Sequence, residues 1–312
     1  MLQAVPIIGI APFSGTDVAA ARQVVDTVAH ACRTLGFFLV TGHGVDPLMV
    51  RNLYDQARSF FDLPAAAKLV ASPADSRAGG LGFMELGRES LAGTAGTVAP
   101  GDYKQSLNYG PLLPGGAWPA QPLGLQDAFV AYFAAMEALA ARLRGIFCNA
   151  IGLPHDHFES EFNGHLSALR VIDYPEPQSP LLPNQLRAGA HTDYGFLTIL
   201  RSEASSGGLQ VQRRDGVWID VPALDDAFVI NIGDAFMRWT NDVWVSTPHR
   251  VANPPDDAHT GSRRQSIPFF SNPRSDTVIR CLDQFCDAHQ PARYDPVTYG
   301  DYIALKTAQA NA

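Results

Sequence analysis

A series of short apolar segments fills the second half of the chain and limits the possible fold more than any other feature. After about residue 166, segments of ~5 residues rich in β-branched and aromatic side chains follow one another at regular intervals. They are LSALRVIDYP, HTDYGFLTIL, GLQVQ, VWIDV, FVINIGDAF, VWVSTPHRV, SIPFF and TVIRC. Short strands separated by turns are typical of a sandwich, barrel or jelly roll and argue against a parallel α/β sheet. We therefore predict an all-β core for this half.

The first half has apolar residues at helical spacing. One helix is predicted after the capping residue Asp17 and is expected to stop at Gly36, and a second is predicted to start at Asp46-Pro47. FFLVTGHGV fits a buried strand between them, and the longest helical pattern is QDAFVAYFAAMEALAARLRGIFCNAIG. Glycine and small polar residues dominate residues 72–116. We predict a long loop there that covers a binding site, with a linker as the alternative.

These patterns predict four consecutive regions of a single structure. They are an N-terminal region with the cover loop (1–120), a long supporting helix (121–165), the all-β core (166–285) and a C-terminal tail or helix (286–312). A chain of 312 residues with 46% hydrophobic residues can bury a large core.

Charge and composition exclude several classes of partner. The formal net charge is −8 and no run of basic residues is longer than a pair, which argues against nucleic acid. No stretch of ~18 apolar residues lacks charges, and the first residues do not resemble a signal peptide. We expect a cytoplasmic protein without a membrane partner. Its oligomeric state is open, with a monomer plausible. Cys32, Cys148, Cys281 and Cys286 form no Cys-x-x-Cys pair and are expected to be buried free thiols.

His191 and Asp193 stand two residues apart at the head of the segment HTDYGFLTIL. On a strand, residues i and i+2 point to the same side and can share one metal ion. The pattern is common by chance, so it needs a third ligand. His249 supplies one from a later segment that could return beside the first. Two imidazoles and one carboxylate are the facial triad of non-haem Fe(II) oxygenases, which leaves coordination positions open for chemistry.

Arg264 and Ser266 form an Arg-x-Ser pair on another predicted strand. The guanidinium and the hydroxyl would share one face of that strand. A buried arginine among apolar neighbours is costly unless an anion meets it. A ligand carboxylate could do so through two parallel charge-assisted bonds, and a structural salt bridge is the alternative.

Together, these segments resemble the isopenicillin N synthase-like branch of the Fe(II)/2-oxoglutarate-dependent dioxygenases. The resemblance spans nearly the whole chain, through VPIIGI, ACRTLGFFLVTGHGV, LRVIDYP, HTDYG, NIGDAFMRWTNDVWVSTPHRV and RRQSIPFF. It implies a mainly β fold with α, in which a double-stranded β-helix (jelly-roll) core carries a helix-rich N-terminal region packed against it. It also implies Fe(II) as the metal, 2-oxoglutarate as cosubstrate and O₂ as oxidant.

The resemblance further implies roles for particular residues. Iron would be held by His191, Asp193 and His249. The distal carboxylate of 2-oxoglutarate would be held by Arg264 and Ser266, with Tyr174 as a further hydroxyl donor. The chain departs from the family at Ile172, where many plant members carry asparagine. Isoleucine cannot donate a hydrogen bond, so the cosubstrate contact from this strand must come from Tyr174 or water.

The implied activity is oxidation of a small molecule, by hydroxylation, desaturation or cyclisation, with release of succinate and CO₂. One alternative is a 2-oxoglutarate-independent oxidase of the isopenicillin N synthase or aminocyclopropanecarboxylate oxidase type. A remote one is a non-enzymatic, metal-containing jelly-roll binding protein, which would leave Arg264 without an anion. We expect a largely apolar or aromatic substrate in a pocket lined by Phe83, Met84, Asn108, Tyr109, Tyr194 and Phe270. Phe83 and Phe270 could instead belong to the core.

Overall fold

A computed structural model describes residues 4–72, 82–111, 118–203, 207–255 and 261–310, and two stacked β-sheets form its centre. The major sheet has the strand order β1-β2-β10-β7-β12-β5-β4-β3. Its strands, in that order, are Ile7–Gly9, Phe37–Thr41, Phe228–Ile232, Leu197–Ser202, Arg264–Ser271, Ala168–Tyr174, Gln105–Tyr109 and Gly82–Met84. The minor sheet has the order β6-β11-β8-β9, with strands Ala188–His191, His249–Val251, Leu209–Gln212 and Trp218–Asp220. Neighbouring strands are antiparallel except β1 and β2.

The two faces of the major sheet bury different clusters of apolar side chains. The inner face meets the minor sheet in a cluster that joins Leu39, Ile172 and Tyr174 to Val211 and Val251. The outer face packs against helices in the larger cluster. Two sheets closed over a common interior, with helices on the outside, confirm the predicted mainly β jelly-roll fold.

The first 110 residues contribute more to the major sheet than the sequence indicates. β1, β2, β3 and β4 come from this region and extend the sheet at both edges. The glycine-rich stretch 72–116, predicted as a loop, therefore contains two strands as well as the short helix η3 (Leu91–Ala95). Residues 73–81 and 112–117 of this stretch lie outside the described residues.

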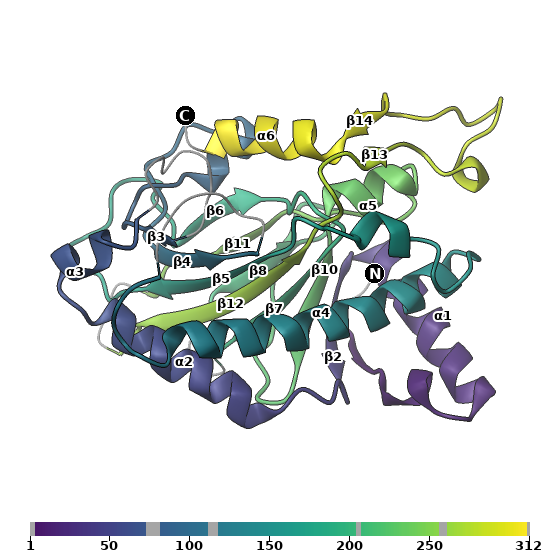
Figure 1. Cartoon of the computed structure of the whole chain (residues 1–312). Coiled ribbons are helices and arrows are strands. Elements are labelled where there is room, and N and C mark those ends of the chain that lie inside the picture. The colour runs from purple at the N-terminus through teal and green to yellow at the C-terminus, as the bar shows by residue number, and fades with distance from the viewer. Residues whose placement is uncertain (1–3, 73–81, 112–117, 204–206, 256–260, 311–312) are drawn as a thin grey trace.

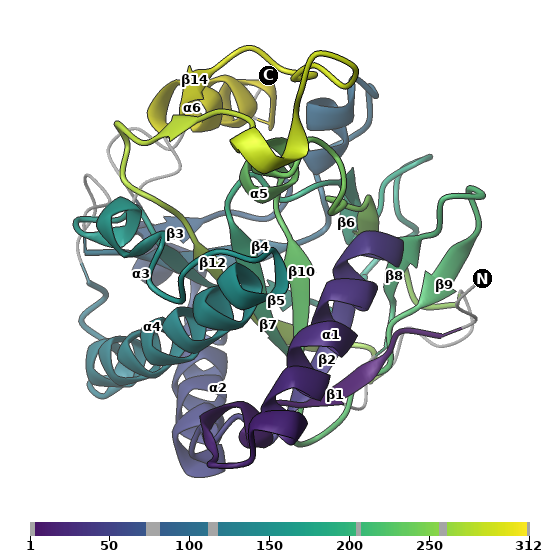
Figure 2. The ribbon, with the colours of Figure 1, turned by 90° about the vertical axis from the view of Figure 1, so that its right-hand side faces the viewer.

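Helices cover the outer face of the major sheet (Figures 1 and 2). They are α1 (Val18–Thr34), α2 (Pro47–Phe61) and α4 (Leu125–Ala150), the last running along the sheet. The short helix α3 (Ala65–Leu69) buries none of its residues and lies at one end of the sheet (Figure 1). As predicted, the Asp17 carboxylate caps α1 by accepting the Ala19 N–H at 2.9 Å. Gly36 ends α1 with φ +67°, and a Cβ there would lie 2.0 Å from the Val245 carbonyl oxygen, so only glycine fits.

The remaining elements lie outside the two sheets. They are η1 (Ala11–Ser14), η4 (Glu159–Phe162), α5 (Asp234–Trp239), η5 (Asp283–Phe285), the pair β13 (Val278–Ile279) and β14 (Val297–Thr298), and α6 (Tyr299–Ala310). Figure 1 shows α6 on the side of the sheets opposite α4. The N–H of Ser90, just before η3, donates to the Ala310 carbonyl at 3.0 Å. Within the described part of the chain, no helix has the length and apolar content needed to cross a membrane.

Candidate active site

His191, Asp193 and His249 come together at the end of the minor sheet where β6 ends and β11 begins. One ligand atom from each lies within 4.8 Å of the others. The Oδ1 atom of Asp193 is 3.9 Å from Nε2 of His191 and 3.8 Å from Nε2 of His249. These spacings suit three donors around one ion, and imidazole and carboxylate ligands suit Fe(II). Among the described residues, no other group of His, Cys, Asp and Glu side chains converges in this way.

Strand pairing brings the two histidines together. His249 opens β11 directly opposite His191, the last residue of β6. The Nδ1 atom of His191 lies 2.8 Å from the Gly189 carbonyl oxygen, and that of His249 lies 3.2 Å from the Thr247 carbonyl oxygen. Each carbonyl can accept an Nδ1–H, which leaves the Nε2 lone pairs free for a metal.

Asp193 does not lie on the strand that carries His191, so the sequence-based reason for pairing them was wrong. β6 ends at His191, β7 begins at Leu197, and Asp193 lies in the connection between them. Two hydrogen bonds orient its carboxylate instead. Its Oδ2 accepts from Thr198 Oγ1 at 2.5 Å and from Asn231 Nδ2 at 2.7 Å. With Oδ2 occupied, Oδ1 faces the two imidazoles.

Sequence reasoning missed Thr198 and Asn231, although each left a signal. Asn231 is the one polar residue in the buried strand β10, FVINI, and Thr198 lies within the apolar segment FLTIL. Burying an amide or hydroxyl among apolar neighbours is costly unless it has a partner. A polar residue at such a position therefore indicates a second buried polar group, which here is the Asp193 carboxylate.

The connection that carries Asp193 packs closely against the start of α5. The Asp234 N–H donates to the Asp193 carbonyl at 2.8 Å, and the Ala235 N–H donates to that of Gly195 at 3.1 Å. A Cβ on Gly233 would lie 2.1 Å from the Gly195 carbonyl oxygen, so the two backbones can approach only because residue 233 is glycine. The buried Asp234 carboxylate accepts from Tyr302 of α6 at 2.7 Å and from Thr192 at 3.2 Å. The C-terminal helix is thereby tied to the metal-binding connection.

Electrostatics hold the triad in its ligand form. Burial, together with the neighbouring His249 ring, keeps the pKa of His191 well below its usual range, so the imidazole is neutral. Burial alone would raise the pKa of Asp193, but the two histidines and the hydrogen bonds from Thr198 and Asn231 outweigh it and lower that pKa. A neutral imidazole and an ionised carboxylate are the forms that bind metal.

Arg264 lies on the inner face of β12 and is fully buried. Its Nη2 donates to Ser202 Oγ at 2.5 Å, and its guanidinium lies 4.9 Å from the centre of the Tyr174 ring. Nε and Nη1 have no hydrogen-bond partner among the described residues, and no described carboxylate pairs with this arginine. A buried cation with two unused donors fits an anionic ligand and argues against the structural salt bridge.

A second buried arginine strengthens the positive potential at this end of the interior. Arg187 is 2% exposed and donates from Nη2 to the Ser262 carbonyl at 2.5 Å. Burial lowers the pKa of Arg187, and the charge of Arg264 lowers it further. Two cations that share one buried region favour an anion between the sheets. The sequence did not single out Arg187.

Ser266 and Ile172 lie opposite each other on β12 and β5, and both are buried. Arg264 and Ser266 share the inner face, as predicted from their spacing. The side chain of Ile172 belongs to the apolar cluster between the sheets, so this position offers no donor to a cosubstrate. Tyr174, two residues further along β5, remains the residue of that strand with a hydroxyl on the inner face.

The residues predicted to line a substrate pocket divide between the two faces of the major sheet. Asn108 and Met84 lie on the inner face, because their positions alternate along β4 and β3 with residues that face the helices. Nδ2 of Asn108 lies 3.3 Å from the sulfur of Met84. Phe270 is paired with Thr198 on the inner face and is partly exposed. Tyr194 follows Asp193 and lies under the Lys306 ammonium of α6.

Phe83 and Tyr109 do not belong to this pocket. Phe83 packs against Phe60 of α2, and Tyr109 packs against Phe129 and Phe133 of α4. Both are therefore core residues between the sheet and the helices. The prediction failed because side chains alternate along a strand, and sequence proximity to Met84 and Asn108 does not tell which of two neighbours faces the interior.

An internally paired charge cluster faces the same interior and was also missed. Arg170 of β5 donates from Nη1 to both carboxylate oxygens of Glu89, at 3.2 and 3.0 Å. Lys104 lies 2.9 Å from Glu89 and 2.8 Å from Asp102. Burial alone would lower the pKa of Lys104, but Asp102 and Glu89 raise it. The signal in the sequence was Arg170 itself, a charge inside the apolar segment LRVIDYP.

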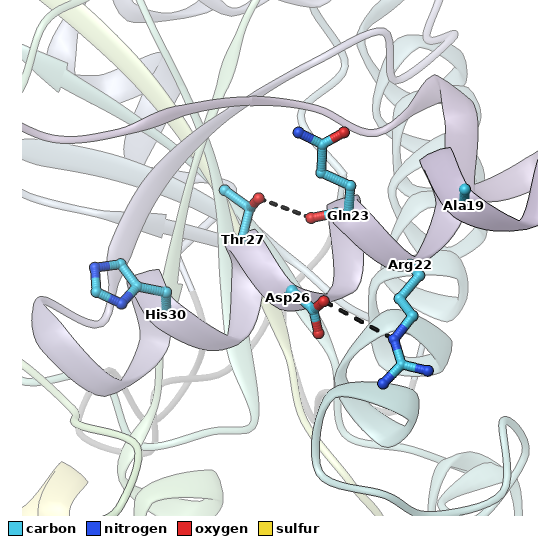
Figure 3. A pocket seen from close by; sticks show the side chains of 6 residues that line it. All are labelled: Ala19, Arg22, Gln23, Asp26, Thr27 and His30. Carbon is cyan, nitrogen blue, oxygen red and sulfur yellow. Dashed lines mark hydrogen bonds and ion pairs between the residues drawn. The ribbon is translucent and has the colours of Figure 1, made fainter.

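A hollow on the exposed side of α1 lies apart from this chemistry. Figure 3 shows its lining, which is Ala19, Arg22, Gln23, Asp26, Thr27 and His30. Arg22 pairs with Asp26 at 4.0 Å, and the Thr27 hydroxyl donates to the Gln23 carbonyl. Each of these polar groups therefore has its partner on the neighbouring turn of α1. This is an ordinary solvated helix surface.

Two family models match the chain. One, described as the 2OG-Fe(II) oxygenase superfamily, matches residues 165–273, and the other, described as "non-haem dioxygenase in morphine synthesis N-terminal", matches residues 5–127. Similar proteins include the 2-oxoglutarate-Fe(II) type oxidoreductase hxnY of Emericella nidulans, 30% identical over 96% of this chain and 88% of the relative. Jasmonate-induced oxygenase 3 of Arabidopsis thaliana is 31% identical over 96% of this chain and 80% of its own length.

Solved structures resemble the whole fold. A full-length protein of Neurospora crassa in complex with alpha-KG has a TM-score of 0.86 and 28% identity, covering 97% of this chain and 95% of that one. A further structure of the same Neurospora crassa protein contains thymine as well, with the same TM-score. JOX2 in complex with 2OG, Fe and JA has a TM-score of 0.81 and 30% identity, covering 98% of this chain and 86% of that one.

Proposed function

The chain belongs to the isopenicillin N synthase-like branch of the 2-oxoglutarate/Fe(II) oxygenase superfamily, and from this premise we propose that it oxidises a small molecule with a largely apolar or aromatic body. The protein is an oxidoreductase that uses Fe(II), 2-oxoglutarate and O₂. The proposed outcome is hydroxylation, desaturation or cyclisation of the substrate, coupled to release of succinate and CO₂.

The proposal on the substrate rests on the kinds of side chain that lie on the inner face between the sheets. The residues that could line the space beside the triad include Phe270, Met84 and Tyr194, which offer apolar and aromatic surface. The charged residues Arg170 and Glu89 pair with each other. A pocket of this kind favours a substrate without net charge, which Asn108 or the edge of the Arg170–Glu89 pair could orient through hydrogen bonds.

The residues of this chain have separate tasks in the proposed reaction. His191, Asp193 and His249 hold the iron, which with bound 2-oxoglutarate and O₂ supplies the oxidising chemistry. Arg264 and Ser266 bind the distal carboxylate of 2-oxoglutarate. The Tyr174 ring makes a cation–π contact with the guanidinium of Arg264. Phe270 and Tyr194 exclude water and place the substrate beside the metal.

The similar structures support a small-molecule substrate. Those of the Neurospora crassa protein and JOX2 contain thymine and JA, respectively. The 2-oxoglutarate-independent oxidase is not favoured, because hxnY is named a 2-oxoglutarate-Fe(II) type oxidoreductase and the structures of the Neurospora crassa protein and JOX2 contain 2-oxoglutarate. The position of Arg264 also favours a 2-oxoglutarate-dependent enzyme, because Nε and Nη1 of this buried residue need an anion even before substrate binds.

Substrate-dependent formation of succinate tests the proposal. The purified protein, loaded with Fe(II), is assayed against panels of aromatic and aliphatic metabolites, peptides and oligonucleotides. We expect coupling with neutral members of the metabolite panel. Coupling only with peptides or oligonucleotides would refute the substrate class.

Two variants localise the pocket. Phe270→Ala should change the order of preference among the active metabolites, because it removes apolar surface next to Thr198. Phe83→Leu is the matched control, since Phe83 packs on α2 and should leave the order unchanged. An unchanged order in Phe270→Ala would return this residue to a structural role.

A further inference from the structure

The short turn around η5 carries two cysteines on its flanks. Cys281 and Cys286 bracket the segment Leu282–Phe285, and the Phe285 N–H donates to the Leu282 carbonyl at 2.8 Å to close the turn. The backbone is extended at both Leu282 and Cys286. A chain that reverses between two extended residues brings the flanking side chains side by side.

The two thiols lie around the same oxygen atom. Sγ of Cys281 lies 3.3 Å and Sγ of Cys286 lies 3.7 Å from the Leu282 carbonyl oxygen. Both residues are partly exposed, whereas Cys32 and Cys148 are buried. The sequence predicted four buried thiols, because a Cys-x₄-Cys spacing does not reveal that a turn brings two of them to the surface.

We propose that Cys281 and Cys286 form a thiol–disulfide exchange site that reacts with small-molecule disulfides of the glutathione type and closes to an intramolecular disulfide. The site is separate from the metal centre and does not depend on the proposed substrate. Its basis is the geometry of the turn, which already holds the two sulfurs together at a position that solvent reaches.

The reaction proceeds in two balanced exchanges. The thiolate of Cys286 attacks one sulfur of oxidised glutathione, forming a mixed disulfide and releasing one glutathione thiolate. Cys281 then loses its proton and attacks the Cys286 sulfur, which releases the second glutathione. Two protein thiols are oxidised, one glutathione disulfide is reduced to two thiols, and the two protons end on the glutathiones. Burial and the neighbouring Cys286 thiol raise the pKa of Cys281 to about 12, which agrees with Cys286 as the first to react.

The site lies at the end of α5 remote from the metal ligands. The Leu282 N–H donates to the Trp239 carbonyl at 2.9 Å, and the Asn241 amide donates to the Phe285 carbonyl at 3.1 Å. The disulfide would close a ring that contains Leu282 and Phe285. Oxidation therefore fixes the turn that caps α5, whose first residue, Asp234, bonds to the Asp193 carbonyl.

Mass spectrometry of the full-length protein tests this site. The protein is equilibrated in glutathione buffers from reduced to oxidised, quenched with acid, alkylated and digested with trypsin. Arg280 and Arg293 bracket both cysteines, so one peptide reports on the pair. We expect that peptide to carry two alkyl groups in reducing buffer, and to carry none and weigh two hydrogen atoms less than the unmodified dithiol peptide as the buffer becomes oxidising. Cys32 and Cys148 should stay alkylatable after denaturation at every ratio.

The variant Cys281→Ser distinguishes an intramolecular disulfide from a mixed disulfide with glutathione. Cys281→Ser should stop at a mixed disulfide on Cys286, because no second thiol is present to displace glutathione. A wild-type peptide that keeps both thiols in oxidised glutathione, that stops at the mixed disulfide, or that cross-links two chains would overturn the proposal. The wild-type measurement decides the question even if a variant folds poorly.

Discussion

His191 and His249 lie directly opposite each other in the antiparallel pairing of β6 and β11, with ring centres 4.2 Å apart. The pairing sets the distance between two metal ligands from separate parts of the chain. The third ligand, Asp193, is not part of a strand and depends on side-chain bonds for its orientation. The centre therefore has two ligands positioned by backbone pairing and one positioned by polar contacts, and these should respond differently to mutation.

Removal of any one ligand should abolish activity. His191→Ala, Asp193→Ala and His249→Ala each leave two protein donors, too few to hold Fe(II) tightly. We expect a large loss of iron affinity with the fold retained, measured by iron titration and circular dichroism. Wild-type affinity in one of these variants would remove that residue from the triad.

Removal of the Thr198 hydroxyl should weaken iron binding less severely. Thr198→Val keeps the shape of the side chain but removes one of the two hydrogen bonds that Oδ2 of Asp193 accepts, so we expect about a 10- to 100-fold loss of iron affinity. Thr277→Val is the matched control, because Thr277 donates a similar bond at 3.0 Å to Glu161, away from the metal. Equal iron affinities in the two variants would show that the bond to Asp193 does not orient it.

Arg264→Ala should weaken 2-oxoglutarate binding far more than iron binding. Charge-assisted bonds contribute ~1.5–3 kcal/mol each, so loss of one alone corresponds to about 10-fold or more in the dissociation constant. Ser266→Ala should cost less. Arg263→Ala is the control, since this neighbour points to the opposite face and pairs with Asp62 and Asp173. Calorimetric titration with an inert metal measures all three, and an unchanged constant in Arg264→Ala would place the anion site elsewhere.

Glu89 should make the protein sensitive to acid. Burial alone would raise its pKa, but Arg170 and Lys104 outweigh burial and hold the pKa of Glu89 well below its usual range. Because the folded-state pKa is the lower one, the stabilisation is complete above the unfolded-state value of about 4.3 and is lost as the pH falls below it.

A comparison with Glu89→Gln isolates that contribution. The variant should be less stable at neutral pH, and its melting temperature should fall less between about pH 5 and pH 3, where an unfolded glutamate binds its proton. Wild type and variant are both measured without metal, so that His191, Asp193 and His249 contribute equally to the two melting temperatures. Identical slopes would contradict a paired, ionised Glu89.

The chemical identity of the site could be predicted from the sequence because it depends on residue types. Two histidines, one aspartate and an Arg-x-Ser pair among apolar segments are unusual enough to indicate a metal and an anion. Most strands after residue 166 and the helices α1, α2 and α4 were also predictable, since periodicity and capping are local properties, whereas β3 and β4 were not.

The tertiary structure alone decided which side chains meet. β10 lies between β2 and β7, and only this arrangement brings Asn231 to Asp193. Arg170 could be seen as a buried charge in the sequence, but its partner Glu89 lies in a segment with no periodicity. Phe83 and Met84 face opposite sides because side chains alternate along a strand, and the register between β3 and β4 decides that Met84 is the one that faces the interior. Residue type and periodicity are properties of short segments, whereas register and strand order depend on pairings between distant ones, which form only when the whole chain folds.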